Sequence, residues 1–76
     1  MNLGYLKDKN QARLATAQAC IAGANLAAAN VLCWNVLDHD RKDPVAWHLL
    51  GTVAAKLQIW DKATEFFGIA SELGIA

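Results

Sequence analysis

Apolar residues recur every three or four positions along most of the chain, which is the spacing that one face of an α-helix requires. Four segments show this spacing, over about residues 10–23, 26–38, 44–58 and 61–74. No segment alternates apolar and polar residues between turn dipeptides, as a β-hairpin would. The pattern therefore predicts an all-α protein with four helices.

Several ends of the predicted helices carry specific residues. The Asp43 side chain is expected to cap the third helix, and Pro44 suits the first helical position after it. Asp61 is expected to cap the fourth helix, and Gly74 suits the left-handed backbone that often follows a helix. Because the connections contain only a few residues, the sequence predicts two pairs of antiparallel helices.

A shift of 34 residues relates the two predicted pairs. It superposes Ala17 on Gly51 and Ala29 on Ala63, so small residues coincide where the two helices of a pair must approach closely. Few residues are identical, but the pattern of residue size is kept. This is the behaviour of a solenoid built from stacked helix pairs.

The second pair resembles a tetratricopeptide repeat. The residues that carry the resemblance are Trp47, Leu50, Gly51, Trp60, Ala63, Phe67 and Ala70. Together with Ala17 and Ala29 of the first pair, they are expected to pack the repeats. Ala54 stands where the family usually has Tyr, and Ile75 stands where it usually has Pro. The resemblance implies two helical hairpins packed as a short right-handed solenoid: residues 1–9 form an N-terminal arm, residues 10–43 a degenerate repeat and residues 44–76 a second repeat.

A narrower resemblance covers about half the chain. Residues 36–75 are similar to the first well-formed repeat of the small tetratricopeptide chaperones of bacterial type III secretion, which hold translocator proteins, and the chain is also similar to the shorter chaperones that hold needle subunits. The shared features are a Leu-Gly pair at residues 50–51, a turn after Gln58, and an aromatic-Asp-x-Ala sequence at residues 60–63. The resemblance implies a cytoplasmic protein that holds an aggregation-prone partner.

In such a fold the first helix of each pair lines a concave groove. The expected groove residues are Leu14, Gln18, Ile21, Val45, His48, Leu49 and Thr52. Tetratricopeptide domains that bind acidic carboxyl-terminal tails use Lys and Asn there, whereas this chain has Leu14, Gln18 and Leu49 at the matching positions. An apolar groove suits an amphipathic helix or an extended apolar segment of a client. Alternatively, the groove residues pack against the N-terminal arm.

The last predicted helix is expected to leave an apolar end of the molecule uncovered, because a solenoid normally closes with a polar capping helix. Ile69, Leu73 and Ile75 have no expected partner within the chain, and Trp34 lies off the packed face of its helix. Such a patch predicts a partner, either another copy or a different subunit. Alternatively, the chain is a piece of a longer repeat protein.

Composition and charge narrow the choice of partner. Apolar residues make up 55% of the chain and charged residues 18%, which excludes an intrinsically disordered tail. Lys and Arg together number seven, as do Asp and Glu, so nucleic-acid binding is not expected.

The longest uncharged run, residues 14–37, contains Gln and Asn and favours a soluble core over a membrane hairpin. Charged residues at positions 7–9 interrupt any signal peptide, which predicts a cytoplasmic location.

The chemically reactive residues form no catalytic or metal-binding pattern. His39 and His48 are nine residues apart, with no nucleophile at a suggestive spacing. Residues 38–43 have the acidity of a calcium loop but lack its Gly and its closing Glu. Cys20 and Cys33 are expected to be reduced core thiols. We therefore expect no enzymatic activity, no cofactor and no metal.

The combined prediction is a protein-binding module that acts as a small bacterial secretion chaperone or co-chaperone and holds an apolar or helical segment of a client. It is expected to form an oligomer with itself or with another subunit. Two alternatives stay open at this point. One is a fragment or adaptor of a larger repeat scaffold without chaperone duty, and the other is a small membrane-associated subunit that uses the Ala-rich helices.

Overall fold

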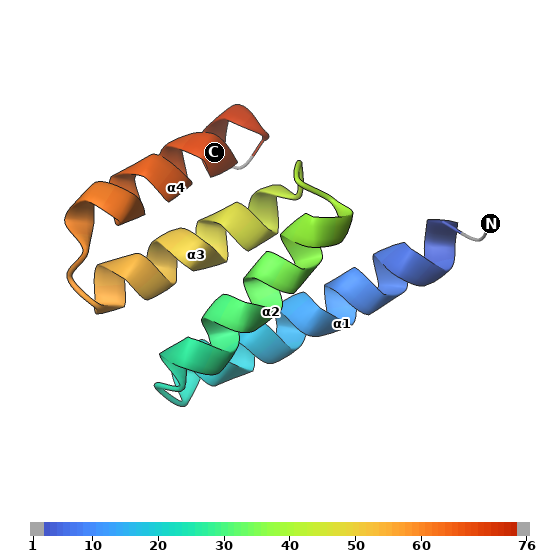
Figure 1. Ribbon diagram of the computed structural model, residues 1–76, viewed down its shortest axis with the longest axis horizontal. Helices are drawn as coiled ribbons and strands as arrows, with labels where there is room; N and C mark the ends of the chain where they lie inside the picture. Colours follow the sequence, from blue (N-terminus) through green and yellow to red (C-terminus); the bar gives the residue numbers. More distant parts are fainter. Residues whose placement is uncertain (1–2, 75–76) are drawn as a thin grey trace.

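The computed structural model describes residues 3–74, and this part of the chain is built from four α-helices (Figure 1). They are α1 (Leu3–Ala22), α2 (Leu26–His39), α3 (Pro44–Lys56) and α4 (Trp60–Glu72). Residues 3–74 contain no strand. The predicted all-α class is therefore confirmed.

The first helix is longer than the sequence pattern predicts. α1 begins at Leu3 rather than near residue 10, so the segment expected to form an N-terminal arm is helical from residue 3 onward. This segment contains no proline, and once a helix has formed each further residue adds a hydrogen bond at little cost. One turn into the predicted part of the helix, Arg13 Nη1 donates a hydrogen bond to Oδ1 of the buried Asn10 at 3.0 Å.

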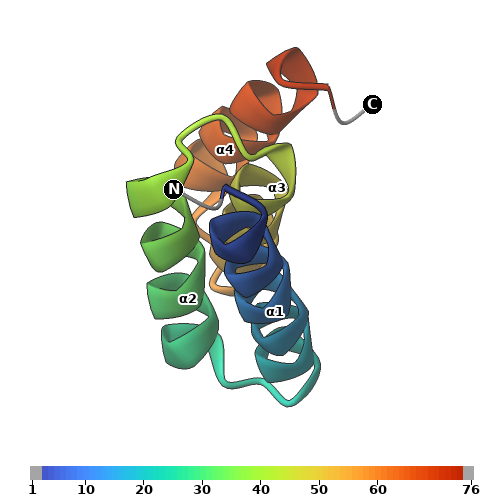
Figure 2. The ribbon, with the colours of Figure 1, turned by 90° about the vertical axis from the view of Figure 1, so that its right-hand side faces the viewer.

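The helices pack in chain order. α1 contacts α2, α2 contacts α3, and α3 contacts α4, while α1 also reaches α3. Figures 1 and 2 show that each helix runs back along the one before it. Within residues 3–74, the backbone of α4 lies beside that of α3, and the Phe66 ring of α4 also reaches the Trp34 ring of α2. The arrangement measures 40 × 27 × 18 Å along its principal axes, which makes it a flat slab.

The turn between α1 and α2 has the same backbone geometry as the turn between α3 and α4, 34 positions later. The backbone N–H···O=C bonds run from Asn25 to Cys20 (2.7 Å) and Ala24 to Ile21 (3.0 Å) in the first turn, and from Ile59 to Ala54 (2.9 Å) and Gln58 to Ala55 (3.0 Å) in the second. Ala24 and Gln58 both have a left-handed backbone, with φ of 64° and 62°. Each turn is a Schellman motif, which closes the end of a helix with two hydrogen bonds.

The residues that begin and end the helices agree with the sequence signals at most positions. The Asp43 carboxylate accepts hydrogen bonds from the N–H groups of Val45 (3.0 Å) and Ala46 (3.2 Å), as expected for a cap of α3. Gly74 has a φ of 123°, so the expected positive φ after α4 is present.

The expectation that Asp61 caps α4 is wrong. The N-cap position of this helix is Ile59, which offers no side-chain acceptor, and Asp61 lies inside the first turn. The Schellman motif leads directly from α3 into α4, so the helix starts before the aspartate. The carboxylate there still interacts favourably with the positive end of the helix dipole.

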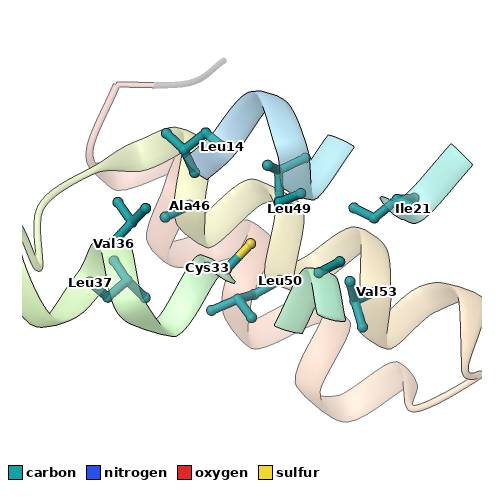
Figure 3. Packing of buried hydrophobic residues seen from close by; sticks show 11 residues of the cluster. Leu14, Ile21, Cys33, Val36, Leu37, Ala46, Leu49, Leu50 and Val53 are labelled. Carbon is teal, nitrogen blue, oxygen red and sulfur yellow. The ribbon is translucent and has the colours of Figure 1, made fainter. Parts of the chain in front are cut away.

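The hydrophobic core lies where α1, α2 and α3 meet (Figure 3). Its buried members are Leu14, Ala17, Ile21, Ala29, Cys33, Val36, Leu37, Ala46, Leu49, Leu50 and Val53. α4 adds the buried Ala63 and Ala70. Gly51 is required where α3 meets α4, because a β-carbon on this residue would come within 2.6 Å of two ring carbons of Phe67.

Candidate protein-binding surface

The apolar residues predicted to line the groove are part of the core instead. Leu14, Ile21 and Leu49 are buried in the cluster shown in Figure 3. Leu14, Ala17 and Ile21 lie along one side of α1, and this side packs against α2 and α3. In this structure these three leucine and isoleucine side chains are therefore not available to a partner.

The other predicted groove residues lie at or near the surface, and most are polar. Gln18 and His48 are exposed, whereas Val45 and Thr52 are half-buried. Thr52 Oγ1 donates a hydrogen bond to the backbone oxygen of His48 at 3.1 Å, and the His48 ring lies 5.2 Å from the ring of Phe67. The accessible part of the predicted groove therefore offers polar contacts rather than an apolar channel.

The predicted apolar end patch is only partly exposed. Trp34 is exposed at 38% of its surface, as expected, but Ile69 and Leu73 are half-buried. Ile75 lies outside the described residues. The expected patch on the last helix is therefore smaller than the sequence suggests.

Trp34 belongs to a cluster of three aromatic rings from three helices. Its ring centroid lies 5.7 Å from that of Trp47 on α3 and 6.1 Å from that of Phe66 on α4, both edge-on. The Trp47 and Phe66 centroids are 5.8 Å apart. Trp47 Nε1 donates a hydrogen bond to the backbone oxygen of Arg41 at 2.8 Å. Edge-to-face pairs at these distances are favourable, so the cluster ties α2, α3 and α4 together.

Most residues expected to pack the repeats are buried or half-buried. The buried ones are Ala17, Ala29, Leu50, Gly51, Ala63 and Ala70, and Trp47 and Phe67 are half-buried. Trp60 is the exception, because 62% of its surface is exposed. It is the first residue of α4 and directly follows the turn from α3.

Trp60 forms part of an exposed apolar segment that the sequence analysis did not identify as a site. Leu57 is 53% exposed and Ile59 is 48% exposed, and both lie in the turn between α3 and α4. We refer to Leu57, Ile59 and Trp60 as the apolar turn. Three large apolar residues within four positions of a predicted turn are the signal that could have revealed it, since turns are normally polar.

The two cysteines are free thiols in different surroundings. Cys33 is buried and Cys20 is half-buried, so the prediction of unpaired thiols holds. Burial, and to a smaller extent the negative charge of Asp43, raise the pKa of the Cys33 thiol from 9.0 to about 11. A thiol that stays protonated at neutral pH is a poor nucleophile and a poor metal ligand.

Among the described residues, no group of three or more His, Cys, Asp and Glu side chains is placed to hold a metal ion. None of the helices in residues 3–74 has the length and apolar character needed to cross a membrane.

Comparisons with protein-family models, with curated proteins and with solved structures found no match to this chain. The surface must therefore be interpreted from its own residues.

Proposed function

We propose that the chain is a tetratricopeptide-like module that binds protein, with its two helix pairs stacked as a short right-handed solenoid. The repeated turn geometry supports the proposal. The first helices of the two pairs end at Ala22 and Lys56, and the second helices start at Leu26 and Trp60, so both boundaries recur after 34 residues. A tetratricopeptide repeat has this length.

Within this class, the proposed role is that of a small bacterial chaperone or co-chaperone of the type III secretion kind. It would hold an apolar or helical segment of a client or partner subunit in the cytoplasm, without a cofactor and without catalysis. The sequence resemblance over residues 36–75 supports this part of the proposal.

The apolar turn carries the proposal. Isolated exposed apolar residues are common on proteins, but three large ones within four positions are not. Trp is also among the residues that contribute most binding energy in protein interfaces. Here the Trp60 side chain is 62% exposed, so its apolar surface is available to a partner. A client with an apolar segment would remove this surface from water.

The test compares Trp60→Ala with Thr64→Ala, an exposed residue one turn later on the same helix. The partner is first captured with the tagged chain from its native host, and both variants are then titrated with it by calorimetry. We expect Trp60→Ala to lose about 2 kcal/mol or more of binding free energy, roughly 30-fold in affinity. Thr64→Ala should bind as the parent does.

Each outcome bears on a different part of the proposal. Equal affinities of the parent and Trp60→Ala would remove the apolar turn as the binding surface. A captured partner that is a large assembled scaffold, rather than a small export protein, would overturn the chaperone role. Circular dichroism of both variants shows whether the helices are retained.

A further inference from the structure

The 34-residue repeat allows burial in the first helix pair to be compared with burial in the second, position by position. Four residues of the first pair are buried in the core where α1 and α2 meet α3, namely Leu14, Ile21, Cys33 and Leu37. Their counterparts 34 positions later are His48, Ala55, Phe67 and Ser71. The first and last of these counterparts are exposed, and the middle two are half-buried.

Residues that pack the two helices of a pair against each other keep their burial in both pairs. Ala17 and its counterpart Gly51 are both buried, and so are Ala29 and its counterpart Ala63. The lower burial of the four counterparts therefore does not reflect looser packing within the second pair. It falls on the side of the pair that, in the first pair, packs against α3.

The four counterparts lie on one surface. His48 and Ala55 are seven positions apart on α3, and Phe67 and Ser71 are four apart on α4, so each two share one side of their helix. The rings of His48 and Phe67 lie 5.2 Å apart, which joins the two sides.

Trp60 extends this surface to the apolar turn. It lies seven positions before Phe67 on α4, and its counterpart Leu26 packs against the core. We refer to these five residues as the open face: His48, Ala55, Trp60, Phe67 and Ser71.

The first pair shows what covers this side of a pair. The occupant there is a helix, α3, whose buried residues on this side are Ala46, Leu49, Leu50 and Val53. A second copy stacked end to end would not supply an equivalent helix. The residues of α1 at the matching positions are exposed but small: Ala12, Ala15, Thr16 and Ala19. They would leave the large rings of Trp60 and Phe67 without large apolar partners.

We propose that the client contributes an amphipathic α-helix, which lies on the open face as α3 lies on the first pair. This inference rests on the proposed function, because the helix belongs to the client, and it names the chemistry of the segment that is held. The contacting side of that helix carries large apolar residues at the spacing of Leu49, Leu50 and Val53. It carries no charge, because the open face contains no Asp, Glu, Lys or Arg to pair with one.

A synthetic helical peptide with leucines at this spacing and no charge on that side is the probe, and a peptide of the same composition in scrambled order is its control. Nuclear magnetic resonance should show that the first peptide, unlike the scrambled one, shifts the amide signals of the open face. Ser71→Arg should raise its dissociation constant about tenfold or more, because the charged side chain would lie under the helix. Ala15→Arg places the same side chain at an exposed position of α1 and should leave the affinity unchanged.

The captured client is titrated against the same variants and against Trp60→Ala. A client that loses affinity with Trp60→Ala but binds Ser71→Arg as it binds the parent would overturn this inference and leave the proposed function standing. Shifts on α1 instead of the open face, or no binding of the peptide, would also overturn it. Self-association that Ser71→Arg and Ala15→Arg weaken equally would identify a second copy as the occupant. Circular dichroism of each variant separates loss of binding from loss of the fold.

Discussion

Gly51 shows how one residue sets the distance between two helices. A β-carbon at this position would meet two Phe67 ring carbons at 2.6 Å, whereas a β-carbon on Gly68 would have nothing within 4 Å. Both glycines lie inside helices, so the general benefit of replacing a helical glycine by alanine applies equally to both. The pair therefore isolates the effect of the close contact.

We expect Gly68→Ala to stabilise the protein by about 1 kcal/mol, because it gains helix propensity at no steric cost. Gly51→Ala should be less stable than Gly68→Ala by about 1–3 kcal/mol, since Phe67 has to move. Urea unfolding followed by circular dichroism measures both free energies of unfolding. Equal stabilities for the two variants would mean that α3 and α4 do not approach as closely as described.

Burial of the Cys33 thiol predicts a pH dependence of stability. Its pKa is raised from 9.0 to about 11 in the folded protein, so between these values the unfolded chain loses its proton more readily than the folded one. The contribution of the thiol is fully present below pH 9 and is lost as the pH rises toward 11. We expect Cys33→Ala to show a weaker fall in the free energy of unfolding over this window. A fall as steep as that of the parent would show that other groups cause it, and Cys20→Ala is the matched control.

At the scale of the helices, the sequence predicts the elements better than their ends. Apolar spacing is a property of many residues, so the four helices are identified from it. An end depends on a few local hydrogen bonds. The cap of α3 can be predicted because the Asp43 side chain itself accepts the hydrogen bonds. The start of α4 at Trp60 instead follows from the backbone turn before it. The left-handed residue of that turn is Gln58, so no glycine marks it in the sequence.

The two left-handed turn residues give a prediction at this scale. A residue with a β-carbon pays about 1–2 kcal/mol in this conformation, while glycine costs about 0.5–1 kcal/mol in chain entropy. Ala24→Gly and Gln58→Gly are each expected to stabilise the protein by about 0.5–1 kcal/mol. Thermal unfolding checks both, with Gly23→Ala as the control at a neighbouring position that lacks a positive φ. A loss of stability in both glycine variants would show that the turns do not have the described geometry.

At the scale of the whole molecule, the sequence could not separate a groove from a core. The sequence pattern predicts that Leu14 and Ile21 of α1 line a groove, yet both residues are buried in the core. An apolar stripe on a helix can either line a groove or pack against neighbouring helices, and its sequence is the same in both cases. Here α1 contacts both α2 and α3, so the position of α3 decides which residues of the stripe stay accessible. Trp60 shows the converse: its place in the repeat pattern predicts a packed side chain, whereas its position as the first residue of α4 leaves the side chain exposed.

The most direct test of the central claim, that this chain works by holding another protein, is the mass and composition of the particle it forms in its native host. The tagged chain is isolated and analysed by size-exclusion chromatography with light scattering and mass spectrometry. We predict a stoichiometric complex that contains a second, small protein with an apolar or helical segment. Recovery of the chain alone, as a particle of 8.2 kDa or twice that mass, would contradict the claim.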